Sequence, residues 1–477
     1  MATLDILGKD EIDKHVKKQP IILAGVLKDI IMTEKKNHSF SVFVNHEYPA
    51  IDRGEGIYLY DTDGNRYIDA SSGPITCSLG HGVTEIAETL KAQAQKTAYV
   101  YRMDFTTPEL EECCSRICEK TGDVMEKVFM VSGGSEATET AIKLARKYHL
   151  EKGNPSKFKV ISRWLSYHGM TMGALALSGF PFRRADYVPY LAGTHHIAPG
   201  YCYRCWFKKQ PETCSLECAE ALENEIMMQG PETVAAFIAE PFSGMSLCAA
   251  APRRDYFKKI REICDKFDVL LIMDEVMTGF GRTGKYFAYE HYDTPPDLIA
   301  LGKGIAGGYF PLGAVAVTAR VIDAIAQGSG IFSAGHTWSG NPLGAAVANK
   351  TMDLLDEQDL VERCRAMGDY LGQGLEELRS HPIVGDVRGE GLMRGIEFVK
   401  DKETREPLDP GLKFWINLHT HARSKGLVIE TSGGCERGQA GDMAMLGPSF
   451  IVTKAEIDQI ITLFDEVLID MEKKIGM

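Results

Sequence analysis

The chain has 477 residues, of which 44% are hydrophobic and 25% are charged. This composition is globular, and the length is roughly two to three times that of a typical domain, so we expect a large core and at least one smaller lobe. The 53 Lys and Arg residues against 66 Asp and Glu give a formal net charge of -13. That balance argues against nucleic acid as the main partner and favours small metabolites.

The N-terminal region and the cysteines bear on where the protein works. An apolar stretch at residues 21–32 is interrupted by Lys28 and Asp29 and is too short to span a bilayer, so we expect neither a signal peptide nor a membrane span. The twelve cysteines are irregularly spaced in a long chain, as reduced thiols would be. A cytoplasmic location is the resulting prediction.

The middle of the chain predicts an α/β fold. Between residues 110 and 317, short apolar runs rich in β-branched residues alternate with helical patterns, which is typical of a mostly parallel sheet covered by helices on both faces. The predicted strands are residues 128–131, 160–161, 234–239, 269–273, 298–301 and 314–317.

The two ends of the chain predict additional structure. Residues 56–68 have the pattern of a β-hairpin with an Asp-Gly turn, and we expect this hairpin to attach to the main sheet. Towards the C-terminus, helical periodicity covers residues 344–356 and 360–379, and a final helix begins at Lys454. A smaller α+β lobe accounts for this pattern.

A carboxylate and a lysine follow two of the predicted strands. Asp274 ends the apolar run 269–273, and Lys303 lies between two glycines after the run 298–301. In open α/β sheets ligands collect at the carboxyl ends of strands. A lysine that can form a Schiff base, with a carboxylate that can protonate a pyridine nitrogen, is the minimum that pyridoxal 5′-phosphate (PLP) needs as an electron sink. Taken singly, a helix-capping aspartate and a solvated loop lysine explain the two residues equally well.

A third motif precedes a strong helical pattern. The strand at residues 128–131 leads into Ser132-Gly133-Gly134-Ser135, and a helix follows from Glu136. A glycine-serine turn that opens a helix offers free N–H groups and the positive end of the helix dipole, which together favour a phosphate.

These motifs, in this order, resemble the class III, or omega, aminotransferase family, and the resemblance extends from about Tyr58 to Phe450. It implies the PLP-dependent fold type I, usually a homodimer with its active sites at the subunit interface. It also implies a large PLP-binding domain at residues 76–345. The small domain would combine an N-terminal segment, residues 1–75, with residues 346–477.

The resemblance implies roles for individual residues. Gly134 and Ser135 would bind the cofactor phosphate, and Thr337 would reach the phosphate in the partner subunit. The remaining implied contacts are ring stacking by Tyr167 and Val276, further cofactor contacts by His168, Glu240 and Asp274, the covalent link at Lys303, and pocket lining by Ile75 and Cys77.

The implied reaction moves an amino group from an omega-amino acid, an amine or a β-amino compound to pyruvate or 2-oxoglutarate. It would be a ping-pong reaction that passes through an internal aldimine on Lys303. A racemase or epimerase of the same fold is the alternative within PLP chemistry. A nicotinamide-dependent dehydrogenase is the alternative outside it, but we find no Gly-x-Gly-x-x-Gly between a strand and a helix. The donor, the acceptor and the choice between dimer and tetramer stay open.

The carboxylate-binding arginine departs from one branch of the family. Enzymes acting on 4-aminobutyrate-type substrates carry an arginine where this chain has Ala444. Arg437 lies about one residue from the place where omega-amine transaminases keep a mobile arginine. We therefore expect Arg437 to bind the substrate carboxylate, with an exposed loop arginine as the alternative. Arg388 and Arg394 are assigned no catalytic role.

A cysteine cluster has a separate interpretation. Cys202, Cys205, Cys214 and Cys218 supply four soft ligands within seventeen residues, which is a spacing that can close a structural zinc site. Buried thiols or a disulfide are the alternatives, and catalysis would not depend on a metal.

Overall fold

The computed structural model describes residues 38–44 and 46–477. A seven-stranded sheet forms its centre, in the order β4-β10-β9-β8-β7-β5-β6. All pairings in this sheet are parallel except those of β10, which is antiparallel to both of its neighbours. The strands are β4 (Lys127–Val131), β5 (Lys159–Arg163), β6 (His195–Ile197), β7 (Val234–Ala239), β8 (Leu270–Asp274), β9 (Leu298–Leu301) and β10 (Gly313–Val317). The predicted, mostly parallel α/β sheet is confirmed.

Alternate residues of the central strands enter two separate cores, because successive side chains of a strand point to opposite faces. In β8, for example, Leu270 and Ile272 pack on one face, whereas Leu271 and Met273 pack on the other. Helices α5 (Gly134–Glu151) and α10 (Ala319–Gln327) cover the first face. The second is covered by α4 (Pro108–Lys120), α9 (Tyr256–Lys266) and α11 (Pro342–Glu357).

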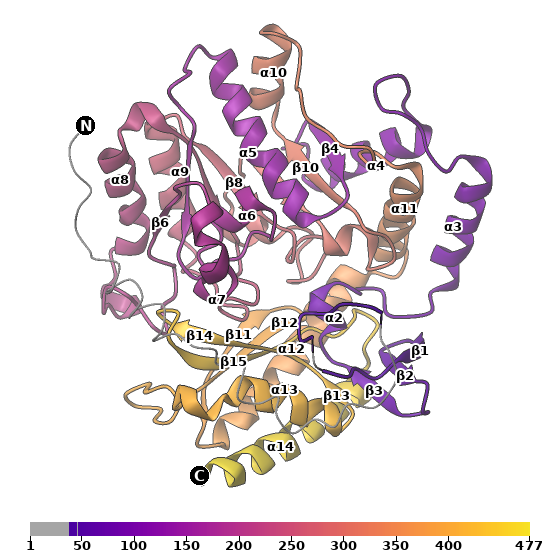
Figure 1. The fold of residues 1–477 in the computed structure, drawn as a ribbon, viewed down its shortest axis with the longest axis vertical. Helices are drawn as coiled ribbons and strands as arrows, with labels where there is room; N and C mark the ends of the chain where they lie inside the picture. The colour runs from indigo at the N-terminus through magenta and orange to yellow at the C-terminus, as the bar shows by residue number, and fades with distance from the viewer. Residues whose placement is uncertain (1–37, 45) are drawn as a thin grey trace.

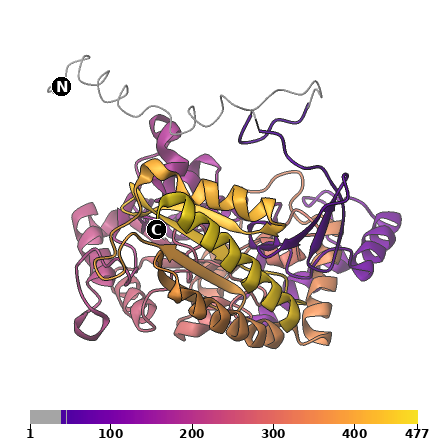
Figure 2. The same cartoon turned by 90° about the horizontal axis from the view of Figure 1, so that it is seen from below.

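The C-terminal part forms an antiparallel sheet of its own, in the order β11-β12-β15-β14. Figure 1 shows this sheet below the seven-stranded sheet. Figure 2 shows α14 between α12 and α13 on the outer face. The elements are β11 (Val384–Glu390), β12 (Met393–Phe398), β14 (Glu430–Glu436), β15 (Ala440–Leu446), α12 (Leu360–Glu377), α13 (Phe414–Ser424) and α14 (Lys454–Ile475).

The N-terminal hairpin joins the C-terminal part rather than the main sheet. Strand β3 (Arg66–Asp69) pairs with β2 (Tyr58–Asp61) as predicted and, on its other edge, with β13 (Leu427–Val428). Strand β1 (Ile51–Glu55) completes this four-stranded sheet. The expectation that the hairpin attaches to the main sheet was wrong, because the edge of β3 is satisfied by backbone groups of β13, more than 350 residues later in the chain.

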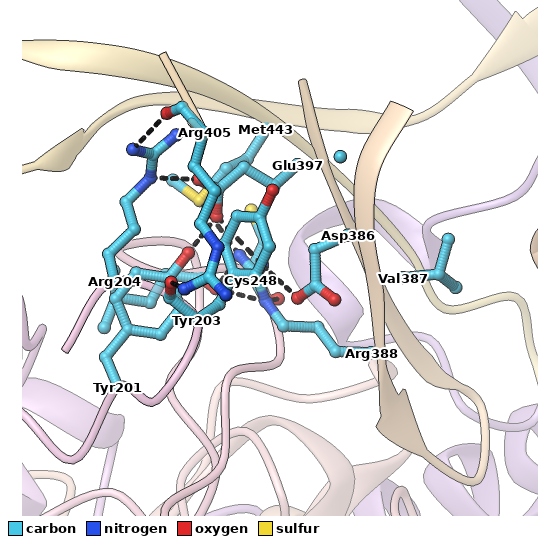
Figure 3. A network of polar contacts seen from close by, with 12 residues as sticks. Tyr201, Tyr203, Arg204, Cys248, Asp386, Val387, Arg388, Glu397, Arg405 and Met443 are labelled. Atoms are coloured by element: carbon cyan, nitrogen blue, oxygen red, sulfur yellow. Dashed lines mark hydrogen bonds and ion pairs between the residues drawn. The ribbon is translucent and has the colours of Figure 1, made fainter. Parts of the chain in front are cut away.

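A network of polar side chains connects the central domain to the C-terminal sheet (Figure 3). Glu397 of β12 is fully buried and accepts hydrogen bonds from Tyr201 and Arg204, which belong to the loop after β6, and from Arg388 of β11 at 3.0 Å. Arg204 also contacts Glu436 of β14, at 3.2 Å. Because a buried carboxylate is costly unless paired, these donors fix the loop against the sheet.

Among the helices that the structure describes, none is long and apolar enough to cross a membrane. The apolar stretch at residues 21–32, for which we expected no membrane span, lies outside the described residues.

Candidate active site

The polar residues that follow the parallel strands meet at one edge of the central sheet. Asp274 ends β8, Lys303 follows β9, Glu240 follows β7 and Tyr167 lies after β5. Gly134 begins α5 directly after β4. The carboxyl ends of parallel strands share an edge, so residues far apart in the sequence converge there.

Asp274 is held in a fixed orientation. One carboxylate oxygen, Oδ2, lies 2.7 Å from Nδ1 of His168, and the other accepts a hydrogen bond from the backbone N–H of Val276 at 3.1 Å. Both Asp274 and His168 are buried. Within the described chain, Nε2 of His168 has no hydrogen-bond partner. The sequence predicted a role for His168, but only the structure shows it as the group that orients Asp274.

Lys303 follows β9, the strand next to β8 in the sheet, and its backbone is strained. Its φ of +41° is in the left-handed region, which is costly for a residue with a side chain and is concentrated at functional sites. Burial lowers the pKa of Lys303 to about 8, and the negative charges of Asp274, Glu430 and Glu240 offset part of that effect. Far more neutral amine is therefore present near neutral pH than in an ordinary lysine, as a nucleophile or base requires.

The start of α5 is open to a ligand. Gly133 caps the helix without a side-chain hydrogen bond, so the first backbone N–H groups are free of a cap. A Cβ at Gly134 would lie 2.6 Å from Cγ1 of Val276, and one at Gly302 would lie 3.0 Å from the same atom. Two glycines thus allow the side chain of Val276 to approach the helix start and the Lys303 loop together.

Ser135 and Glu136 occupy the first turn of the same helix. Ser135 Oγ accepts a hydrogen bond from the backbone N–H of Met170 at 3.1 Å. Glu136, which is not in the predicted set, accepts one from Ser132 N at 2.8 Å and lies 3.1 Å from Nε2 of His336. These contacts draw the carboxylate of Glu136 towards neighbouring donors.

Glu240 is a buried acid with one oxygen free of hydrogen bonds. Its Oε1 accepts from Gly244 N at 3.0 Å, and its backbone carbonyl accepts from Arg163 at 2.6 Å. Oε2 has no hydrogen-bond partner among residues 38–44 and 46–477, and the Arg163 guanidinium is 4.0 Å away from it. Burial raises the pKa of Glu240, and the nearby charges of His168 and Arg163 oppose that rise.

The surroundings of the other predicted residues do not indicate a role in the site. Thr337 is exposed in the single chain. Ile75 is buried, and Cys77 donates to the carbonyl oxygen of Gly80 at 3.2 Å. The guanidinium of Arg437 lies over the ring of Trp206, 5.1 Å from its centroid.

The structure adds two charged residues that the sequence analysis did not select. Glu430, at the start of β14, is near enough to Lys303 for each charge to affect the other group. Arg183 lies in α7 (Pro181–Arg184). Burial raises the pKa of both Glu430 and Tyr167, and the positive charge of Arg183 offsets part of each rise. No motif marks either residue, because each reaches the site only through packing between the two parts of the chain.

The four clustered cysteines do not form a metal site in this structure. All are free thiols, so none is in a disulfide. In the described part of the chain, no three or more His, Cys, Asp or Glu side chains are placed to hold a metal ion. The zinc hypothesis is therefore not carried further.

The comparisons with known proteins decide the family. A family model described as Aminotransferase class-III matches residues 41–468. The chain belongs to the class III aminotransferases. Class III aminotransferases depend on PLP and use an amino donor and a keto-acid acceptor.

Two relatives and two solved structures illustrate this membership. The Bacillus subtilis protein named "Uncharacterized aminotransferase YodT" is 36% identical, covering 90% of this chain and 96% of its own. The putrescine–pyruvate aminotransferase of Pseudomonas aeruginosa is also 36% identical, over 87% of this chain and 89% of its own.

The structure of an (S)-enantioselective omega-transaminase from Thermomicrobium roseum superposes with a TM-score of 0.85 at 33% identity, covering 91% of this chain and 96% of that one. A PLP-bound amine transaminase from an uncultivated Pseudomonas species gives a TM-score of 0.84 at 31% identity, with 92% and 98% covered. The class III fold, PLP fold type I, is thereby confirmed.

Proposed function

We propose that this class III aminotransferase binds PLP through Lys303 and moves an amino group from an omega-amino acid, an amine or a β-amino compound to pyruvate or 2-oxoglutarate. The observation that carries the proposal is that Asp274 and Lys303 end or follow the neighbouring strands β8 and β9, at the same edge of the sheet. Lys303 has a lowered pKa, and Asp274 is locked by His168 at 2.7 Å. The relatives that act on putrescine with pyruvate, or that are named omega-transaminases, support the substrate class.

The chemistry of the residues fits this cofactor. Free N–H groups at the start of α5, with Gly134 and Ser135, suit a phosphate. Tyr167 and Val276 would contact the two faces of the ring, and the carboxylate of Asp274 suits a protonated pyridine nitrogen. Bound PLP supplies an electron-withdrawing ring that stabilises negative charge on the substrate carbon.

Residues of the chain itself would transfer the proton and hold the cofactor ring. The neutral Nζ of Lys303 is the group that would accept and return the proton of the substrate carbon. The carboxylate of Asp274 would hold a proton on its ring partner, while the buried His168 keeps this carboxylate from turning away. Glu240, with one buried oxygen free of hydrogen bonds, would line the same space.

The proposed assembly is a homodimer located in the cytoplasm. The family's role for Thr337 is towards the partner's phosphate, and this residue is exposed in the single chain, as a contact across an interface requires. Gel filtration with light scattering would distinguish a monomer, a dimer and a tetramer.

The test begins with the visible absorption of the purified protein after incubation with PLP. We expect a yellow protein whose borohydride-reduced adduct maps to Lys303 by mass spectrometry. The K303A variant should keep its fold by circular dichroism but lose this adduct and about 10²–10⁴-fold in activity.

A donor screen with pyruvate and 2-oxoglutarate then separates the reactions. Net transfer of nitrogen to the keto acid supports the proposal. Inversion of a chiral amino acid without nitrogen transfer would instead identify a racemase, and a protein that gains no absorption band would contradict PLP binding.

A further inference from the structure

A cysteine, a histidine and an aspartate lie in contact around the end of strand β3. Sγ of Cys77 is 3.7 Å from Nδ1 of His81, and Nε2 of the same ring is 3.3 Å from Oδ2 of Asp69. Asp69 is buried, whereas Cys77 is half-buried and the side chain of His81 is 25% exposed. The histidine therefore connects a buried carboxylate to a thiol that is partly open to solvent.

The carboxylate of Asp69 is fixed by its neighbours in the chain. Its Oδ1 accepts hydrogen bonds from the backbone N–H and from the hydroxyl of Ser71, both at 3.2 Å, and its Oδ2 accepts one from the N–H of Gly73, also at 3.2 Å. These donors lie at the start of the short helix α2 (Ser72–Ile75), which follows β3 in Figure 1. The same carboxylate thus orients this turn and the ring of His81.

The pairing with Asp69 keeps His81 positively charged near neutral pH. The hydrogen bond to Asp69 and, to a smaller extent, the one to Cys77 raise the pKa of His81 to about 10, although burial opposes the rise. A doubly protonated ring donates from both nitrogens, so Nδ1 directs an N–H at the sulfur. The thiol hydrogen has its own acceptor, the carbonyl oxygen of Gly80 at 3.2 Å. An adjacent imidazolium favours the thiolate, which is the nucleophilic form of a cysteine.

Cys77 also packs against the loop that carries Lys303. A Cβ on Gly308 would lie 2.9 Å from Cα and 3.3 Å from Cβ of Cys77, so the two backbone segments leave no space between them. The next residue, Tyr309, donates a hydrogen bond from its hydroxyl to the carbonyl oxygen of Gly80 at 2.6 Å. Because protein interiors are close-packed, an atom added at the sulfur would press on this loop.

Two other roles for these side chains are not supported. In the described part of the chain, no three or more His, Cys, Asp or Glu side chains are placed to hold a metal ion, and Cys77 is a free thiol rather than half of a disulfide. A nucleophile beside an imidazole that a third group orients is instead the arrangement of an activated cysteine.

We infer that Cys77 is a nucleophilic thiol, activated by His81 and Asp69, that hydrogen peroxide oxidises, and that this modification lowers the activity of the enzyme. Hydrogen peroxide is small and uncharged, which suits a half-buried thiol. The reactivity of Cys77 stands on the contacts of its side chain alone. The loss of activity rests on the proposed aminotransferase function and on the packing of Cys77 against the Lys303 loop.

The groups at the site balance the oxidation. The thiol proton passes to water, and the thiolate attacks one oxygen of hydrogen peroxide, so that an S–O bond forms as the O–O bond breaks. The departing hydroxide takes the Nδ1 proton of His81 and becomes water, and the ring regains a proton from the solvent. The sulfur is thereby oxidised to a sulfenic acid, and the peroxide is reduced.

The first test measures the reactivity of Cys77 in the wild-type chain. After brief treatment with hydrogen peroxide, dimedone traps sulfenic acids, and mass spectrometry quantifies the label at each cysteine. We expect about tenfold more label on Cys77 than on Cys205, a half-buried thiol without a histidine partner among the described residues. Equal labelling of the two cysteines would overturn the inference, and this comparison needs no variant to fold.

The variant H81Q tests the source of the reactivity. Provided that its circular dichroism matches that of the wild type, label on Cys77 should fall by about tenfold, because the charged donor to the sulfur is lost. Label on Cys205 should stay within about twofold of the wild-type value. Undiminished label on Cys77 would show that His81 does not activate it.

The second test compares each holoenzyme after peroxide treatment with the same protein before treatment. Wild-type protein should lose most of its transaminase activity and regain it with dithiothreitol, because a sulfenic acid is reducible. C77S should keep most of its own activity, whereas C205S, the matched control, should respond like the wild type. A loss in C77S equal to that of the wild type would place the sensitive group elsewhere.

The outcomes separate the inference from the proposed function. If untreated wild-type protein transfers no nitrogen from any donor, the proposed function fails, and the labelling still decides whether Cys77 is reactive. If the protein is active but Cys77 gains no more label than Cys205, the proposed function stands and the inference is wrong.

Discussion

The two sides of the candidate site are built differently. On the central-sheet side, Asp274 is buried and bonded at both oxygens, and its partner His168 is buried with it. On the side formed by α7 and β14, the side chains of Arg183 and Glu430 have no direct polar partner in the described residues. Rigid, paired groups suit one cofactor that stays in place. Unpaired groups at the other side suit two substrates that alternate, because neither must displace an existing bond.

The largest expected effect comes from breaking the rigid side at Asp274. D274N keeps the shape but removes the charge that holds a proton on the ring nitrogen, so kcat should fall by about 10²–10³-fold, with KM changed only a few-fold. Steady-state kinetics with a saturating keto acid would measure it. A turnover number near that of the wild type would remove Asp274 from its role.

The attachment of the two parts can be broken at the buried carboxylate of β12. R204M leaves Glu397 without one of its charged partners, which should reduce the free energy of unfolding by about 3 kcal/mol. Urea titration would measure the loss. The exposed pair Lys91–Glu88 is the control, since K91M should change stability by less than about 0.5 kcal/mol. Equal effects would mean that the network in Figure 3 contributes no more than a surface pair.

The proposed phosphate site at the start of α5 can be tested by adding one methyl group at Gly134. A Cβ at Gly134 would lie 2.6 Å from Val276, so G134A should weaken PLP binding by about tenfold. In the double variant G134A/V276A the clash is removed, and binding should recover at least in part. The Kd follows from absorbance titration of the apoenzyme. A double variant no better than G134A would place the defect elsewhere.

A change of similar size is expected in the pH dependence of cofactor loading. Lys303 must be neutral to attack the aldehyde of PLP, and its pKa is lowered to about 8 from the ordinary 10.5. The loading rate of the apoenzyme should therefore rise about tenfold between pH 7 and pH 9 and then level off. Stopped-flow absorbance would follow it. A rate still rising steeply above pH 10 would indicate an ordinary, solvated lysine.

How well each side of the site could be predicted depends on how far apart in the sequence the interacting residues lie. The apolar runs ending at Asp274 and Lys303, and the glycine-serine turn before α5, are local patterns whose positions at a sheet edge follow from strand geometry alone. The convergence of these residues can therefore be predicted from the sequence. Thr337 and the predicted cofactor contacts remain predictions, as do the domain boundaries at residues 75 and 345.

The prediction that was wrong and the residues that were missed depend instead on contacts between distant parts of the chain. The hairpin at residues 56–68 was expected beside the main sheet, but its free edge pairs with β13 from a distant part of the chain. Arg183 carries no signal in its own sequence context, and it differs from the neighbouring Arg184, whose guanidinium contacts Trp164 and His196, because of where those two residues lie in space. The carboxylate-binding role of Arg437, chosen by its place in the sequence, stays a prediction, and the structure shows its guanidinium over the ring of Trp206.

Local patterns in the chain were enough to predict the α/β core and the family, because periodicity and short motifs are encoded by neighbouring residues. The roles of Lys303 and Asp274 rest on the same patterns and stay predictions. Packing in three dimensions set which charged side chains stay unpaired, how the N-terminal strands join the C-terminal part, and which carboxylates are buried. Those properties depend on which distant segments pack together and exclude water. Because hydrophobic packing is non-directional, a local sequence pattern does not specify which segments these are.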